Sequence, residues 1–387
     1  MKIPLAWLQL TREKVRLLVA LAGIAFADIL MFMQLGFRDA LFESAVTFHR
    51  SLNGDVFIIS TQSTSLIAMR TFSSRRLYQT LGYQGVASVE PVYVDFSLWK
   101  NPENKKTRGI MVIGFNPDDL ALDLPELPSQ TDLIKIPDTI LFDRASREEF
   151  GPVPQLFAQG QLPQGQPVET EVRSRRVRVG GLFSLGASFG ADGNIIASEQ
   201  TFHRIFTNRT RNLIDIGMLR LQPGVDPTQV VAQLRQALPN DVRVFTKAEF
   251  MEFERNYWAE GTAIGFIFTL GTIMGFIVGT VIVYQILYTD VADHLPEYAT
   301  LKAMGYSDLY LLGVVFQEAV ILAFMGYVPG GVLSFFLYNM TRQATNLPMY
   351  MTLARAVTVL ILTIIMCFLS GMIAVRKLQA ADPADIF

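Results

Sequence analysis

The sequence predicts an α-helical membrane protein with four transmembrane helices and one large α+β domain inserted between the first two. The first observation is composition: the 387 residues are 50% hydrophobic and 18% charged, with a mean hydropathy of +0.31. Soluble proteins are on average less apolar and carry about 25% charged residues. The second is that four apolar stretches reach the ~20 residues that cross ~30 Å of hydrocarbon. The third is the ordinary soluble character of residues 38–261.

The predicted spans are residues 17–37, 262–289, 309–337 and 356–375. The second and fourth contain no charged residue, whereas the first carries Asp28 and the third Glu318. The first span is longer than the ~7–15 apolar residues of a signal peptide, and no small-x-small cleavage site follows it. We therefore expect an uncleaved anchor.

Orientation follows from the basic residues that flank the first and last spans, because such residues favour the cytoplasmic side. They are Lys2, Arg12, Lys14, Arg16, Arg376 and Lys377. Residues 1–16, 290–308 and 376–387 are accordingly predicted to be cytoplasmic, and residues 38–261 and 338–355 to lie outside. The loop 290–308 is more acidic than basic, which weighs little because acidic residues contribute little to this rule.

The outer domain is predicted to be α+β with two subdomains. Five segments rich in β-branched and aromatic residues indicate strands: 55–61, 87–98, 109–115, 168–183 and 213–222. Asp226 and Pro227 are an N-cap and a first-turn residue for a helix over 227–237. The prolines and glycines between residues 125 and 167 predict long loops there.

Two stalk helices are predicted to join this domain to the spans. Thr246 and Glu249 form a capping-box pair, so a helix begins near Lys247 and, without an intervening proline, continues through the second span. Such a helix of roughly 40 residues would be roughly 60 Å long, and residues 247–261 would stand above the membrane. A similar extension follows the first span over residues 38–52. The alternative is a break at Gly261 with a flexible linker.

Several function classes lack the residues that they need. Gly-Lys does not occur anywhere, so this chain has no P-loop for ATP. His49, His203 and His294 are far apart, with the first two predicted outside and the third inside, which excludes a three-histidine metal site. Cys367 is the only cysteine, so no intrachain disulfide forms, and the net charge of −2 does not favour nucleic acid as a partner. We expect no enzymatic activity and no cofactor in this chain.

Two features of the spans allow two interpretations each. Gly271, Gly275 and Gly279 form one small-residue face of the second span, for close helix packing either within the chain or at a dimer interface. Asp28 and Glu318 are costly in a bilayer, at about 2.5–3.5 kcal/mol each near its centre. They belong either to a proton relay or, as we favour, to structural polar contacts.

The inner loop is the most specific feature. Pro296 can open and Gly305 can end a short helix, and Tyr298, Leu301 and Met304 would share its apolar face. That face is available to a cytoplasmic partner or to the lipid surface. The alternative is a plain turn between two spans, although a turn needs fewer residues.

This loop resembles the coupling helix of permeases in the MacB/FtsX superfamily of ABC transporters, whose pattern is R-E-[hydrophobic]-x-x-L-[KR]-A-[hydrophobic]-G. The matching residues are Glu297, Tyr298, Leu301, Lys302, Ala303, Met304 and Gly305. Pro296 replaces the arginine. Residues 381–384 resemble the family's D-P ending, and one span, an outer domain and three spans is the family's layout. MacB carries a fused ATPase, whereas this chain begins 16 residues before its first span, so we expect a separate ATPase that holds the ATP and Mg²⁺.

Among stand-alone permeases, the chain resembles the DevC type of cyanobacteria, through residues 3–10 and 297–305. That resemblance implies a homodimer in the bacterial inner membrane with its large domain in the periplasm. It further implies a DevA-type ATPase, a DevB-type periplasmic adaptor, a TolC-like outer-membrane channel and the export of a glycolipid. The expected mechanism is mechanotransmission, in which ATPase closure moves the coupling helix, the spans and then the outer domains. A lipoprotein-releasing permease and an FtsX-like regulator of cell-wall hydrolases are the alternatives.

Overall fold

The computed structural model describes Trp7, Arg12 and residues 14–158, 168–294, 300, 304, 308–345 and 347–380, with only the backbone of 308–312 and 376–380. The chain divides into two compact units. One, the membrane bundle, comprises Met1–Ala40 and Ala263–Phe387. The other, the outer domain, is Leu41–Thr262. Each is described by itself.

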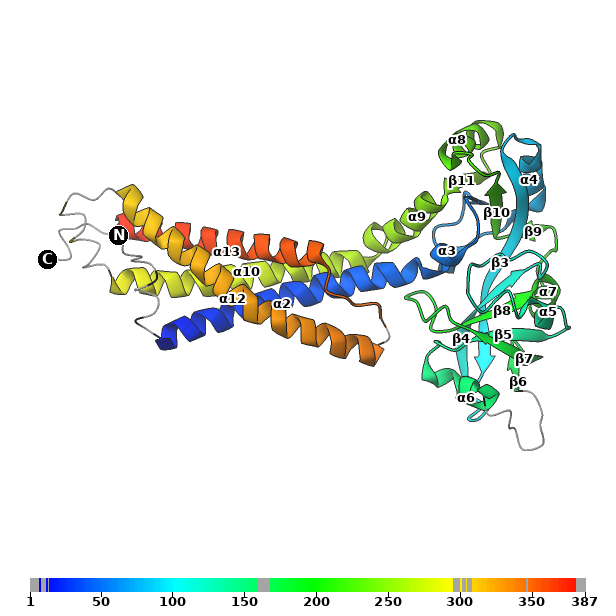
Figure 1. Ribbon diagram of the computed structural model, residues 1–387, viewed down its shortest axis with the longest axis horizontal. Helices are drawn as coiled ribbons and strands as arrows, with labels where there is room; N and C mark the ends of the chain where they lie inside the picture. The colour runs from blue at the N-terminus through cyan, green and yellow to red at the C-terminus, as the bar shows by residue number, and fades with distance from the viewer. Residues whose placement is uncertain are drawn as a thin grey trace. The chain divides into compact units, whose positions relative to one another are not determined.

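The membrane bundle contains four long helices, α2 (Lys14–Ala45), α10 (Ala263–Asp293), α12 (Asp308–Thr345) and α13 (Leu353–Ala380) (Figure 1). Among the described residues, these four are long and apolar enough to cross a membrane, which confirms the predicted spans. Each helix extends beyond its predicted span because the residues that flank the apolar stretch still favour helix. Residues 338–345, predicted as outer loop, therefore continue α12 instead.

Small and aliphatic side chains fill the centre of the bundle. One cluster gathers Ala20, Ile24 and Ala27 of α2 with residues of all three other helices, and a second surrounds Phe32 and Tyr338. Large apolar side chains also face outward, among them Phe266, Leu270, Ile277, Phe336 and Ile361. An apolar exterior of this kind is what a helix in contact with lipid requires.

The outer domain is built on one nine-stranded sheet with the strand order β11-β1-β10-β3-β4-β8-β5-β7-β6, and β2 pairs with β9 separately. The strands are β1 (Val56–Ser60), β2 (Phe72–Ser73), β3 (Val86–Lys100), β4 (Thr107–Phe115), β5 (Thr139–Asp143), β6 (Glu169–Val172), β7 (Arg175–Phe183), β8 (Asn194–Ser198), β9 (Leu213–Ile214), β10 (Ile216–Leu221) and β11 (Val242–Thr246). Pairs β4–β8 and β5–β7 are parallel, and the other pairs are antiparallel.

The long strand β3 joins two halves of the sheet. Its first part pairs with β10, and its second part, from Tyr93, pairs with β4 (Figure 1). The second half closes on itself where Trp99 of β3 pairs with Val172 of β6. The two expected subdomains are therefore two halves of one sheet, and hydrophobic clusters pack against its two faces.

Short helices cover this sheet. They are α3 (Thr47–Ser51), η1 (Leu66–Ala68), α4 (Ser74–Gln79), η2 (Thr80–Gly82), α5 (Thr131–Ile134), η3 (Glu148–Phe150), α6 (Val153–Ala158), α7 (Glu199–Ile205), α8 (Pro227–Ala237) and α9 (Lys247–Glu260). The prediction of α8 is confirmed at both ends, with Asp226 accepting from the Thr228 N–H. The capping box of Thr246 and Glu249 at the start of α9 is also confirmed.

The predicted set of strands needs three corrections. Residues 168–183 form a hairpin, β6 and β7, whose turn places Arg173 and Ser174 at positive φ. Residues 125–167, predicted as loops, contain β5 in the interior of the sheet, and β8 and β11 were not predicted at all. All five residues of both β5 and β8 are buried, so they show no alternation that the sequence could reveal.

The continuous helix predicted from residue 247 through the second span is wrong. Helix α9 ends at Glu260 and α10 begins at Ala263. Glycine costs a helix about 1 kcal/mol relative to alanine. In addition, the Thr262 hydroxyl donates to the carbonyl of Trp258 (2.9 Å) and so engages an acceptor of the helix ladder. The break at Gly261 is the outcome that these local costs favour.

Candidate functional site

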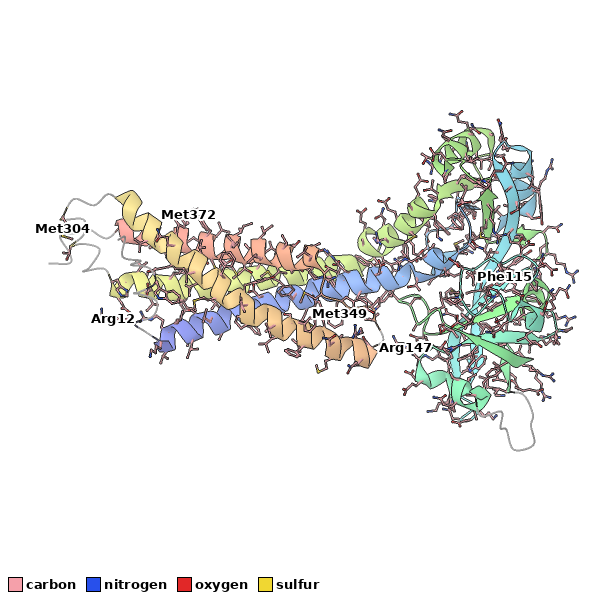
Figure 2. The ribbon with its side chains drawn as sticks, in the orientation of Figure 1. Arg12, Phe115, Arg147, Met304, Met349 and Met372 are labelled. Atoms are coloured by element: carbon pink, nitrogen blue, oxygen red, sulfur yellow. The ribbon has the colours of Figure 1, made fainter. Side chains whose placement is uncertain are left out.

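The predicted coupling segment lies almost wholly outside the described residues. This holds for Glu297, Tyr298, Leu301, Lys302 and Gly305, and for the C-terminal motif 381–384. Met304 is described: it is exposed, and its N–H donates to the carbonyl of Thr300 (3.0 Å). Figure 2 shows Met304 and Arg12 at the same end of the bundle and Met349 at the opposite end. The segment thus connects the end of α10 to the start of α12.

A polar cluster, here called the inner cluster, stands where α10 leads into this segment. It consists of Arg16, Asp290, Asp293, His294 and Glu318. Nη2 of Arg16 lies 2.6 Å from Oδ2 of Asp293, and Nη1 lies 3.8 Å from Oδ1 of Asp290. His294 is buried and places Nδ1 2.9 Å from the carbonyl oxygen of Asp290. The first turns of α2 and the last turn of α10 are therefore tied together.

Glu318 brings α12 into the same cluster. Its side chain is fully buried, and its carboxyl group lies close enough to that of Asp290 for the two charges to interact. The guanidinium of Arg16 also faces Asp290, with Nη1 3.8 Å from its Oδ1, so Asp290 lies between a cation of α2 and a carboxyl group of α12. Glu318 thus belongs to a polar contact among three helices at one end of the bundle. A displacement of the segment after His294 would act on all three.

Asp28 has a separate environment. It is fully buried, and the hydroxyl of Thr363 on α13 donates to its Oδ1 (2.5 Å). Gly330 of α12 packs against it, since a Cβ built on this glycine would lie 2.9 Å from the Cβ of Asp28. These contacts join three helices.

The glycine face of α10 packs against α2 of the same chain. A Cβ built on Gly271 would lie 2.5 Å from the Gln34 side chain, and one on Gly279 would lie 2.6 Å from the Cβ of Ala27. Gly275 likewise faces α2, at Met31. This face therefore makes close helix contacts within the chain.

The opposite end of the bundle carries an ion pair that the sequence analysis missed. Arg355 places Nη2 2.8 Å from Oδ2 of Asp39 and donates through Nη1 to the carbonyl of Tyr350 (2.8 Å). Its guanidinium lies 5.4 Å from the ring centroid of Tyr338, whose hydroxyl donates to the carbonyl of Phe32. The sequence offered one signal for this pair: the acidic Asp39 follows the first predicted span, and the basic Arg355 precedes the fourth.

A buried pair of titratable groups in the outer domain was also missed. His49 of α3 and Glu254 of α9 lie 3.8 Å apart and are both almost fully buried. Burial raises the pKa of Glu254 to about 7, against the hydrogen bonds that it accepts from the Leu66 N–H and the Trp258 indole. Burial likewise lowers the pKa of His49 to about 3. Around pH 5 to 6 both groups are therefore uncharged, which suits an apolar site.

A cavity of about 660 Å³ opens beside β3, β4 and the β6–β7 turn. Lys100 in its wall pairs with Glu171 (3.0 Å), and the guanidinium of Arg173 lies over the Phe206 ring at 5.3 Å. These cations are engaged within the domain, so we assign no ligand to the cavity. Among the described residues, no group of three or more His, Cys, Asp or Glu side chains could hold a metal ion.

Two family models match the chain. Residues 17–237 match the MacB-like periplasmic core domain, and residues 262–383 match the FtsX-like permease C-terminal region. No curated protein matches.

Among solved structures, the periplasmic region of MacB from Actinobacillus actinomycetemcomitans is 10% identical, with a TM-score of 0.35, over 53% of this chain and 94% of that one. The extracellular domain of the noncanonic ABC-type transporter YknZ from Gram-positive bacteria is 11% identical, with a TM-score of 0.31, over 49% and 98%. A domain described as part of a permease from Porphyromonas gingivalis is 14% identical, with a TM-score of 0.27, over 51% and 90%. At such TM-scores these likenesses add nothing to the family matches.

Proposed function

Because the chain belongs to the MacB/FtsX-like family of ABC-type permeases, we propose that it is the transmembrane subunit of an exporter whose ATPase is a separate polypeptide. One observation carries this proposal. Both family regions occur in one chain, the periplasmic core domain first and the permease region after it. The chain also has the order of one span, an outer domain and three spans. The protein is a multi-pass protein of the inner membrane with a large periplasmic domain.

In this proposal the ATPase binds the segment between α10 and α12 through Glu297, Tyr298, Leu301, Lys302, Met304 and Gly305. The inner cluster supports the transmission step, because it ties the helices on both sides of the segment to α2 through Arg16, Asp290 and Glu318. Helix α2 runs without interruption to Ala45, so a displacement at its first turn can reach the outer domain. Such a mechanism needs no substrate path between the spans.

We further propose the DevC type for this permease, acting as a homodimer with a periplasmic adaptor, a TolC-like channel and a glycolipid as substrate. Residues 3–10 and the segment 297–305 support this assignment by their resemblance to that type. The cargo rests on the resemblance alone. The ATP and Mg²⁺ belong to the partner ATPase.

The coupling assignment is tested with a double variant, Glu297→Ala with Leu301→Ala, coexpressed with the ATPase that copurifies with the unchanged protein. The variant is expected to insert at the level of the unchanged protein and to lose export while the ATPase still hydrolyses ATP. Glu260→Ala, which removes an exposed carboxylate from the last residue of α9, is the control and should export normally. Undiminished export by the double variant would show that this segment does not couple.

A pull-down of the full-length protein from membranes tests the subtype. Recovery of an ATPase, an adaptor and a TolC-like channel supports tripartite export. Recovery of a cell-wall hydrolase instead would favour an FtsX-like regulator, and recovery of an acylated protein would favour a lipoprotein-releasing permease.

A further inference from the structure

Two apolar side chains project from adjacent tips of the outer domain. Ser188 and Ala191 close a tight turn, since the Ser188 N–H donates to the Ala191 carbonyl (2.7 Å) and the Ala191 N–H donates back (3.3 Å). Phe189 stands at the tip of this turn and Ile67 in η1, with 36% and 42% of their surfaces exposed. The two tips touch, because a Cβ on Gly190 would lie 3.0 Å from Cγ2 of Ile67.

Both tips are fastened to helices that continue toward the spans. The Phe189 N–H donates to the Ser44 hydroxyl of α2 (3.2 Å), and the Phe189 ring meets the Trp258 ring of α9 edge to face at 4.5 Å. The Leu66 N–H donates to Glu254 of α9 (2.7 Å), which holds η1 in place. The positions of Phe189 and Ile67 therefore follow those of α2 and α9.

Chain length places these anchor points close to the bilayer. Trp258 precedes the first residue of α10 by five positions, roughly 7 Å at the rise of a helix and at most about 18 Å if extended. Ser44 lies seven positions beyond residue 37 on the uninterrupted helix α2, or roughly 10 Å. The headgroup region of a leaflet is about 5–8 Å deep, so both anchors stand at its level or just above it.

We propose that Ile67, Phe189 and Tyr257, packed on the buried Trp258, form an interfacial foot by which the periplasmic domain contacts the headgroup region of the outer leaflet. Tyrosine favours this region because its ring is apolar at one end and polar at the other. The Trp258 ring is buried, with 6% of its surface exposed, and packs against the rings of both Phe189 (4.5 Å) and Tyr257 (5.2 Å), so it holds these two side chains together. This lipid contact goes beyond the proposed function, since it depends on the topology and not on the ATPase or the cargo.

The test uses the full-length protein in phosphatidylcholine nanodiscs with one cysteine at a time. Cys367 is replaced by alanine, and NBD is attached to Phe189→Cys, to Ile67→Cys or to the control Leu98→Cys, an exposed residue of β3. At positions 67 and 189 we expect blue-shifted emission and a loss of fluorescence with a headgroup-nitroxide lipid. At position 98 we expect neither.

A second measurement leaves the foot unchanged. In a Trp7→Phe, Trp99→Phe background, the headgroup-nitroxide lipid should partly quench the fluorescence of Trp258, which is buried directly behind Phe189. Lipid quenching at positions 67 and 189 no stronger than at 98 would overturn the proposal. Shielding of both labels from the lipid nitroxide and from aqueous iodide would also overturn it, because a protein surface would then cover the foot.

Discussion

Buried carboxylates in the outer domain and Asp28 in the membrane bundle differ in the number of hydrogen bonds that they accept. In the outer domain, Asp143 is fully buried and accepts from three backbone N–H groups and from the amide of Asn194 (2.8 Å). Asp215 accepts from the guanidinium of Arg209 (2.7 Å) and from the Val94 N–H (2.9 Å). Burial still raises the pKa of both aspartates, against these hydrogen bonds.

Around Asp28 in the bundle, close apposition of small residues takes the place of such a network. Asp28 accepts one hydrogen bond, from Thr363, and the surrounding contacts are made by Gly330 and by Gly279 against Ala27. Chains unfolded within a membrane also find polar partners, so a hydrogen bond there adds little net stability, whereas close packing adds more. We therefore expect that the outer domain is destabilised most by the loss of a polar partner. The bundle should be destabilised most by an added methyl group.

The largest effect is expected for Asp215→Ala. It leaves the Arg209 guanidinium, only 10% exposed, without its main partner, and breaking a buried pair in this way costs about 3–5 kcal/mol. The thermal unfolding temperature of the purified protein in nanodiscs should fall strongly. The control is Asp241→Ala, which breaks an exposed pair with Arg76 and should cost about 1 kcal/mol or less. Equal shifts for the two variants would contradict the comparison.

The second prediction concerns pH and the His49–Glu254 pair. A raised carboxyl pKa gives stability that is present below the unfolded value of 4.5 and is lost as the pH rises through about 7. The lowered pKa of His49 acts in the opposite direction, with stability present above 6.5 and lost as the pH falls through about 3. The unchanged protein should therefore lose stability between pH 5 and pH 8, and Glu254→Gln should not. Over this range the free energy of unfolding of the variant should rise by roughly 2–3 kcal/mol relative to that of the unchanged protein.

Thermal unfolding at a series of pH values measures this gain. Glu252→Gln changes an exposed carboxylate on the same helix and should follow the pH profile of the unchanged protein. A stability profile of Glu254→Gln parallel to that of the unchanged protein would show that folding does not raise the pKa of Glu254.

The third prediction sharpens the comparison from the side of the bundle. Gly279→Ala places a methyl group against Ala27 of α2 and should destabilise the bundle by about 1–3 kcal/mol. Gly331→Ala is the control, because the nearest atom to its new methyl group is 4.0 Å away, and it should be neutral or stabilising by up to about 1 kcal/mol. Detergent-induced loss of helical circular dichroism measures both. A tolerated Gly279→Ala would remove the packing argument for this face.

The smallest effect is expected at the outer end of the bundle. Asp39→Asn weakens the pair with Arg355, and because Asp39 is 42% exposed the loss should be about 1 kcal/mol or less. A double-mutant cycle with Arg355→Gln in the same nanodiscs isolates the coupling energy of the pair. A coupling well above that of the Asp215–Arg209 pair would reverse the order that the comparison predicts.

The sequence by itself determined the features that depend on local chemistry. Four spans were predictable because a helix in lipid must be apolar over its whole length. The start of α8 at Asp226 and Pro227 and the capping box of Thr246 and Glu249 were predictable because a cap satisfies its own neighbouring N–H groups. The layout that places the chain in its family followed from the same hydropathy pattern.

Only the tertiary structure decided the features that join distant residues. The pairing of Asp39 with Arg355, of His49 with Glu254 and of the Gly279 face with α2 depends on which surfaces meet. Strands β5 and β8 are buried on all sides within the sheet, so their own residues carry no periodic signal of that position. Helix α9 stops at Gly261 because two small local costs add up where the uninterrupted pattern of the sequence predicted one helix.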